Sequence, residues 1–261
     1  MNDIVATPLD VKLMNMTAWV LWVGFALLVG VTTARWVARL PVFDISGITV
    51  TGDVTHNSAI NLRANVAPRF TGTFFTVDLV RVRAAFEAVP WVRKAVVRRD
   101  FPNRLQVQLQ EHQAVAYWGT QGEFQLINSF GEVFEANVGE VEQDMLPWLS
   151  GPEGQSAEVL QMYRALKPLF ETLELSMDQL ELTGRGSWRA HLDTGADIEM
   201  GRGEPQEVSE RVLRFLKTVT QIAGRYGRRA NSVEAADLRH DNGYALKLRG
   251  VSTIAPQEPK K

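Results

Sequence analysis

The sequence predicts an α+β protein with an N-terminal transmembrane helix, a first domain of order β-α-α-β-β, and a second domain whose mixed sheet carries two helices. Three observations predict it: residues 13–34 carry no charge, strand and helix patterns fill the rest of the chain, and the balance of charge changes along it. Basic residues outnumber acidic ones from Val42 to Tyr117, and the reverse holds from Trp118 to Ile254. A length of 261 residues suits one or two domains at roughly 150 residues each.

The composition excludes several classes of protein. With 45% hydrophobic and 22% charged residues, the chain is ordinary for a globular protein and unlike a wholly disordered one. It has no cysteine, which rules out a disulfide framework, a thiolate metal site and cysteine catalysis. Its isoelectric point of about 6.1 argues against a dedicated nucleic-acid binder.

The uncharged segment is expected to cross a membrane once. Residues 16–34 are almost all apolar, and a helix of that length rises roughly 28 Å, enough to cross the hydrocarbon core. Trp19, Trp22 and Trp36 lie toward its ends, where indoles favour the interface. No small-x-small cleavage site precedes Arg35, so we expect an uncleaved anchor over residues 15–36, preceded by a tail over 1–14. The flanking charges are close to neutral and do not decide its orientation.

The first domain, residues 42–117, begins with a strand and two helices. The apolar run from Val42 predicts a strand that ends at Gly52. Ser58 is expected to cap a short helix that reaches Val66. Asp78 is expected to cap a second helix with one apolar face, which Pro90 ends.

A hairpin completes the first domain. Residues 91–99 alternate, and so do residues 105–110, where leucine and valine alternate with glutamine. This pattern predicts two half-buried strands joined by the turn Phe101–Asn103. Both helices can then pack against one face of the hairpin.

The second domain, residues 118–254, mixes short strands with two helices. Strands are expected at 124–127 and 133–134, flanking a turn, and again at 179–183, 188–192 and 197–200. Apolar residues recur at helical spacing over 157–173 and 208–223. Two closing strands flank an Asn-Gly turn, and the tail 255–261 is expected to be disordered.

No constellation for catalysis or metal binding emerges. The four histidines are far apart in the sequence, so no metal-binding spacing exists, and no GxSxG motif occurs. The clusters Gly184–Gly186 and Gly201–Gly203 lack the features of phosphate loops and are better explained as tight turns. We therefore expect a non-enzymatic protein that needs no cofactor and no metal.

One basic cluster stands out, formed by Arg93, Lys94, Arg98 and Arg99. Aromatic residues do not interleave with it and its charges fall on both faces of a strand, so it is a poor nucleic-acid site. Three interpretations remain open: a solvated strand, a partner-docking edge, or contact with lipid headgroups.

Several motifs resemble one known family. The order of anchor, FDISGITVTGD, GTFFTVD and VPWVRKAVVRRDFPNRLQVQLQEHQAVAYW is similar to the POTRA domain of the FtsQ family of bacterial cell-division proteins. The resemblance continues through LINSFGEVF, LPWLSGPEG, LTGRGSW, MGRGE and VEAADLRHDNGYALKL and covers nearly the whole chain. One departure is Gln113, where the family commonly has proline.

The register of the closing hairpin can be argued from its apolar residues. A three-residue loop at 241–243 would pair Leu238 with Leu246 and Ala236 with Leu248, giving one apolar face. The polar face would then pair Asp237 with Lys247. Gly243 would occupy the left-handed position of a bulge.

The last strand, 244–250, is expected to be an edge strand, which is either guarded or used to accept a strand from a partner. The resemblance implies that it docks an FtsB protein within an FtsQ–FtsB–FtsL complex, with Arg185 as a second anchor. His240 stands where the family often has an aromatic residue. The residues implied on this edge are Arg239, His240, Asn242, Gly243, Tyr244, Leu246 and Leu248.

The resemblance implies a divisome scaffold that links early and late division proteins. It places the chain in the inner membrane at the septum, with residues 1–14 cytoplasmic and the bulk periplasmic. The second strand of the POTRA domain would meet other division proteins through Arg93, Lys94, Val96 and Arg98. The alternative is a POTRA-bearing component of an outer-membrane assembly or secretion system, which the anchor and the lack of a barrel pattern disfavour.

Overall fold

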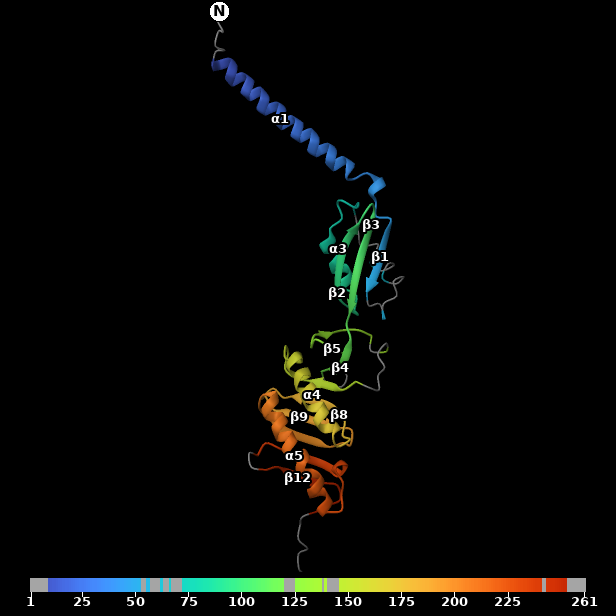
Figure 1. The fold of residues 1–261 in the computed structure, drawn as a ribbon, viewed down its shortest axis with the longest axis vertical. Coiled ribbons are helices and arrows are strands. Elements are labelled where there is room, and N and C mark those ends of the chain that lie inside the picture. The colour runs from blue at the N-terminus through green and yellow to red at the C-terminus, as the bar shows by residue number, and fades with distance from the viewer. Residues whose placement is uncertain are drawn as a thin grey trace, which may run out of the picture. The chain divides into compact units, whose positions relative to one another are not determined.

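The computed structural model describes residues 9–52, 55, 56, 62, 66, 72–119, 125–137, 139, 146–240 and 243–252. The chain divides into two compact units, residues 1–111 and 112–261. The first begins with α1 (Leu9–Val37), the expected apolar helix, which is long and apolar enough to cross a membrane (Figure 1). It starts earlier than residue 15, and Asp10 in its first turn suits the positive end of the helix dipole.

A three-stranded sheet follows α1 in the first unit. Its strands are β1 (Gly47–Gly52), β2 (Val92–Asp100) and β3 (Arg104–Glu111), in the order β1-β3-β2, with β1 parallel and β2 antiparallel to β3. The alternation in β3 is confirmed, because Leu105, Val107 and Leu109 are buried while the glutamines between them are not.

The helix α3 (Leu79–Glu87) covers this sheet, and Val82 and Phe86 enter the core. Its expected cap is confirmed: Oδ1 of Asp78 accepts the backbone N–H of Val80 at 2.9 Å. The expected helix at 58–66 lies outside the described residues, except for Leu62 and Val66, which are both buried.

The expected strand at residues 42–45 is wrong. Pro41–Phe43 forms a 3₁₀ turn, in which Phe43 N–H donates to the carbonyl of Leu40 and Asp44 N–H to that of Pro41, both at 3.0 Å. Pro41 has a fixed φ suited to the first position of such a turn. Asp44 forms only an isolated bridge, to Thr73, and β1 begins at Gly47.

The second unit contains a nine-stranded mixed sheet in the order β12-β11-β10-β9-β8-β7-β4-β5-β6. Helices α4 (Ser156–Glu171) and α5 (Pro205–Arg225) pack against each other and against the sheet. The strands are β4 (Ala114–Trp118), β5 (Gln125–Asn128), β6 (Val133–Phe134), β7 (Trp148–Ser150), β8 (Met177–Leu182), β9 (Trp188–Leu192), β10 (Asp197–Gly201), β11 (Val233–Asp237) and β12 (Ala245–Leu248).

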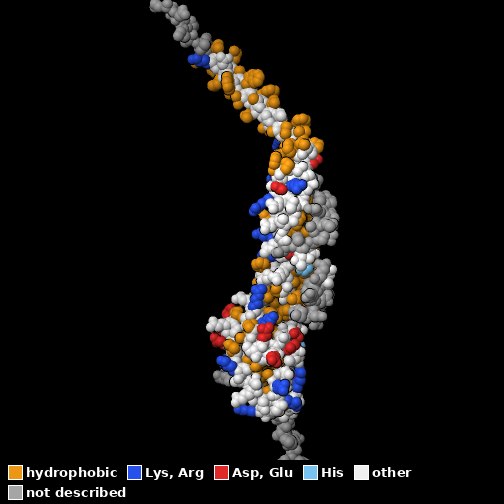
Figure 2. Space-filling view, turned by 45° about the vertical axis from the view of Figure 1, so that its right-hand side comes forward, with side chains coloured by type: hydrophobic (Ala, Val, Ile, Leu, Met, Phe, Trp, Pro, Cys, Tyr) orange, Lys and Arg blue, Asp and Glu red, His pale blue; other side chains and the backbone are white. Residues whose placement is uncertain are grey.

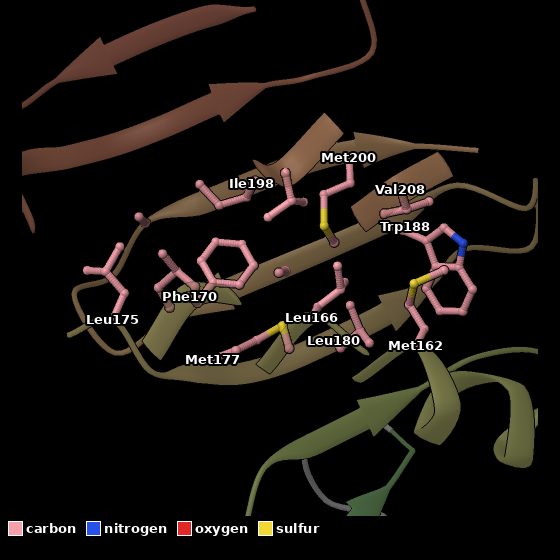
Figure 3. Packing of buried hydrophobic residues seen from close by; sticks show 14 of the residues in the cluster. Met162, Leu166, Phe170, Leu175, Met177, Leu180, Trp188, Ile198, Met200 and Val208 are labelled. Atoms are coloured by element: carbon pink, nitrogen blue, oxygen red, sulfur yellow. The ribbon is translucent and has the colours of Figure 1, made fainter. Parts of the chain in front are cut away.

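The core of this unit lies between the two helices and the sheet. Figure 3 shows Met162, Leu166 and Phe170 of α4 opposite side chains from β8, β9 and β10. Trp188 is the largest fully buried side chain, and its indole N–H donates to the carbonyl of Gly203 at 3.2 Å. This bond ties β9 to the turn that follows β10.

The boundary between the units differs from the expected one after Tyr117. Strand β4 pairs with β5 and with β7, so it belongs to the second sheet, and the second unit begins at His112. Strand β7 was not predicted, because three residues are too few for alternation to show. The tail 255–261, expected to be disordered, lies outside the described residues.

The predicted register of the closing hairpin is wrong by two residues. Ala236 pairs with Leu246 and Asp237 with Ala245, and Gly243 does not adopt a left-handed backbone. Beyond β11, the N–H of Leu238 donates to the carbonyl of Glu199 in β10 at 2.7 Å, so this residue does not pair with β12. A shift of two keeps every side chain on its predicted face.

The predicted ion pair across the hairpin is also wrong. Lys247 contacts Glu234, and Asp237 contacts Arg239. The last strand is shorter than residues 244–250, because only Ala245–Leu248 pair with β11.

Candidate functional site

Strand β12 forms one edge of the nine-stranded sheet, as expected. Arg249 N–H donates toward β11, to the carbonyl of Ser232 at 2.9 Å. Because successive residues of a strand alternate in direction, Lys247 and Ala245 also face β11, whereas Leu248 and Leu246 present their backbone outward. Among the described residues, no hydrogen bond uses the outward N–H and C=O of Leu246.

The side chains of β12 separate into two faces. Leu246 is half-buried and Leu248 is buried in the main core, whereas Ala245 and Lys247 are exposed. Tyr244 lies on the same face as Leu246: its hydroxyl is 2.7 Å from Oγ1 of Thr218 in α5. A strand added beside β12 would therefore extend an apolar face on one side and a polar face on the other.

Arg239 follows β11 and is held by Asp237. The guanidinium Nε donates to Oδ1 at 2.8 Å, Nη2 donates to Oδ2 at 2.5 Å, and the backbone N–H of Arg239 donates to Oδ1 at 3.1 Å. The side-chain hydrogen bond from Arg239 lowers the pKa of Asp237 to about 2. This two-point contact fixes the direction of an otherwise exposed arginine.

The Asp237–Arg239 pair predicts a pH dependence of stability. The folded pKa of Asp237 lies below its usual value of 3.8, so the pair stabilises the fold above about pH 4. This contribution is lost as pH falls toward 2. We expect Asp237→Asn to flatten the thermal stability of the second unit over that interval, measured as melting temperature against pH. Equal slopes for Asp237→Asn and the unchanged chain would contradict this.

Arg185 and Arg239 both line a groove of about 850 Å³. Arg185 comes from the turn between β8 and β9 and makes no hydrogen bond or ion pair within the described part of the chain. Six arginines line the groove against three glutamates, which favours acidic side chains of a partner. The charged residues are Arg185, Arg189, Arg202, Arg211, Arg214, Arg239, Glu199, Glu207 and Glu210.

Two of these arginines, Arg189 and Arg211, hold the walls of the groove together through hydrogen bonds. Arg189 donates to Glu199 at 2.6 Å and to Glu181 at 3.3 Å, so it joins β8, β9 and β10. Arg211 donates to the carbonyls of Met200 and Arg202, on either side of Gly201. A side chain at Gly201 would meet Arg211 at 2.7 Å, and its φ of +80° also favours glycine.

A smaller hollow of about 360 Å³ lies beside the hairpin loop. His240, Gly243 and Tyr244 line it together with Arg214 and Lys217 of α5. Arg211 and Arg214 line both hollows, so the predicted edge residues and Arg185 share one surface. We call this surface, with β12, the C-terminal edge site.

The structure adds residues to the predicted site and changes the role of others. Arg211, Arg214 and Lys217 were not predicted, although their spacing of three along α5 was a usable signal. Leu248 is 6% exposed, so only its backbone can meet a partner. Asn242 lies outside the described residues. Within the described ranges, no three acidic or histidine side chains come together to hold a metal ion.

The basic cluster of the first unit lies on β2, an edge of its sheet. Lys94, Val96 and Arg98 are exposed, and Arg93 is half-buried, with Nη1 donating to Gln110 at 3.3 Å. Arg99 has a different role: it donates to the carbonyl of Phe74 at 2.7 Å and to that of Val77 at 2.9 Å. Arg99 therefore holds a loop in place.

Comparisons with known proteins agree with this architecture. Residues 43–112 match the family described as POTRA domain, FtsQ-type, and residues 116–239 match Cell division protein FtsQ/DivIB, C-terminal. Cell division protein FtsQ of Thiomonas arsenitoxydans is 37% identical over 250 residues, 94% of this chain and 89% of the relative. Cell division protein FtsQ of Burkholderia pseudomallei is 34% identical over 253 residues, 97% of this chain and 98% of the relative. The protein of that name from Bordetella pertussis is 38% identical over 255 residues.

Proposed function

Because this chain belongs to the FtsQ family of cell-division proteins, we propose that it is a divisome scaffold that links early and late division proteins. The family is one of non-enzymatic structural division proteins, in agreement with the expectation that the chain is not an enzyme. Family membership favours this role over the alternative in outer-membrane assembly or secretion.

The partner proposed for the C-terminal edge site is an FtsB/FtsL-type division protein that adds a strand to β12. The observation that carries the proposal is the outward backbone of Leu246 on an edge strand. Main-chain hydrogen bonds would supply affinity, and the groove of Arg185 and Arg239 would select acidic side chains.

Other division proteins are proposed to dock on β2 of the POTRA domain, through Arg93, Lys94, Val96 and Arg98. Lys94, Val96 and Arg98 are exposed on an edge strand, so their side chains are accessible to a partner. Two edges, one in each unit, would let one chain hold two partners at once.

Localisation tests the scaffold proposal. A fluorescent fusion of the full chain is expected at midcell in dividing cells, and Lys94→Glu with Arg98→Glu is expected to reduce that signal by reversing the charge of β2. As the matched control, Leu246→Pro should still reach midcell but fail to retain the FtsB-type partner. A wild-type fusion dispersed over the envelope would contradict the proposal.

We propose that residues 1–14 lie in the cytoplasm and that the chain after Arg39 lies in the periplasm. The family supports this orientation, whereas Lys12, Arg35 and Arg39 leave the positive-inside rule close to neutral. Alkaline phosphatase fused after the second unit is therefore expected to be active. An inactive phosphatase together with an active cytoplasmic reporter at the same position would reverse the orientation.

A further inference from the structure

Phenylalanine rings gather at the end of the first unit that follows α1. Phe43, Phe74, Phe75 and Phe101 come from three separate loops, yet their rings are in contact. The centroids lie 4.9 Å apart for Phe43 and Phe75, 5.2 Å for Phe74 and Phe75, and 6.1 Å for Phe74 and Phe101. We call these four residues, with Val42, the aromatic end cluster.

Much of this cluster faces solvent. Phe101 is 77% exposed, Val42 72% and Phe75 50%. Figure 2 shows hydrophobic side chains gathered where α1 meets the rest of the first unit. A contiguous apolar patch of this kind on a folded domain usually marks a surface that meets another protein or a membrane.

Hydrogen bonds tie the cluster to the residues directly after α1. Oγ1 of Thr73 donates to the carbonyl of Ala38 at 2.5 Å, and Phe74 N–H donates to the carbonyl of Phe43 at 2.7 Å. Ala38 immediately follows the last residue of α1, Val37. The two bonds from Arg99 hold the same loop from the side of β2.

The length of α1 determines how deep in the bilayer the end of the helix and the loop bonded to Ala38 lie. Its 29 residues rise about 44 Å, whereas a hydrocarbon core is about 30 Å thick, so its ends reach the headgroups. Trp36, 67% exposed beside the end of the helix, is the type of residue that lies at a membrane interface. The carbonyl of Ala38 is then at headgroup level, and so is the loop bonded to it.

We infer that the aromatic end cluster inserts into the headgroup layer of the membrane that α1 crosses, and so holds the POTRA domain against the bilayer. The inference rests on the anchoring role of α1. Asp44 and Asp100 lie next to members of the cluster in the sequence and offset two of the three nearby arginines, Arg39, Arg99 and Arg104, so apolar burial supplies most of the attraction. The occupant is lipid, since the bilayer already adjoins the residues that hold the cluster.

Because the chain has no cysteine, a single cysteine can be introduced and labelled without competing sites. The full chain, carrying Phe101→Cys labelled with the fluorophore NBD, is reconstituted into vesicles of phosphatidylethanolamine and phosphatidylglycerol. Part of the lipid carries a nitroxide near the top of its acyl chain. Phe75→Cys serves as an independent second site, Trp36→Cys reports insertion of α1, and Tyr226→Cys is the aqueous control, with 53% exposure in the second unit.

We expect the nitroxide lipid to quench the probes at residues 101 and 75 severalfold more than the probe at 226, and iodide to do the reverse. If residue 36 is quenched while residues 101 and 75 respond like residue 226, the cluster does not enter the membrane and the inference is overturned. If residue 36 is not quenched either, the anchoring of α1 fails and this inference fails with it.

Discussion

Replacing Leu246 with proline is expected to weaken binding of the FtsB-type partner strongly while the second unit stays folded. The backbone N–H of Leu246 points away from β11, so its loss removes a hydrogen bond only from an added strand. The proline ring also obstructs the approach of that strand. We expect binding to weaken by roughly 3 kcal/mol, or about a hundredfold, measured by calorimetry with the chain from Val42 onward.

Two variants, one at the same residue and one at the next residue, serve as controls. Leu246→Ala keeps the N–H and should weaken binding only partly, because strand addition depends mainly on the backbone. Lys247→Pro removes an N–H directed at β11 and should also destabilise the hairpin. If Leu246→Pro binds as tightly as the unchanged chain, the partner docks elsewhere, and β2 of the POTRA domain is the next candidate.

Replacing Trp188 with alanine is expected to cause the largest loss of stability in the second unit. The side chain is 2% exposed and fills the space between α4 and the sheet (Figure 3). Truncating a buried tryptophan costs about 3–5 kcal/mol of unfolding free energy. It also leaves the carbonyl of Gly203 without its indole donor. The melting temperature of the second unit should fall by on the order of 10 °C.

The same substitution should weaken partner binding indirectly. Gly203 lies in the turn after β10, next to the carbonyls of Met200 and Arg202 that hold Arg211, and Arg211 lines the groove with Arg239. Tyr226→Ala is the matched control, since this aromatic side chain is 53% exposed and its removal should change stability by less than about 0.5 kcal/mol. An unchanged melting temperature for Trp188→Ala would mean that Trp188 does not organise this core.

Local sequence patterns predict correctly those elements that are determined by residues close together in the sequence. The cap at Asp78 and the alternation along β3 depend on neighbouring residues, so both could be recognised from sequence. Strand β7 depends on its neighbours β4 and β8, and three residues carry no pattern of their own. The prediction of the hairpin register was wrong for a related reason. The hydrogen bond from Leu238 to Glu199 joins segments that are distant in the sequence, so no local pattern reveals it.

In the candidate site, too, some features follow from local sequence and others depend on contacts between distant segments. The edge position of β12 could be predicted from its place near the end of the chain. The family resemblance implied that Arg185 and Arg239 bind the partner protein. Their meeting in one groove depends on the order of strands β8 to β11, which no local pattern reveals. The basic face of α5 does not mark a site in the sequence by itself, because charged residues on a helix surface usually need no special explanation.

Residue-resolved hydrogen exchange tests strand addition most directly. In the free chain from Val42 onward, the amides of Ala245 and Lys247 should exchange slowly, because they donate to β11, whereas the amide of Leu246 should exchange fast. Saturation with the FtsB-type partner is expected to slow exchange at Leu246 severalfold and to leave Ala245 and Lys247 little changed. Fast exchange at Leu246 in the saturated complex would show that no strand is added to β12.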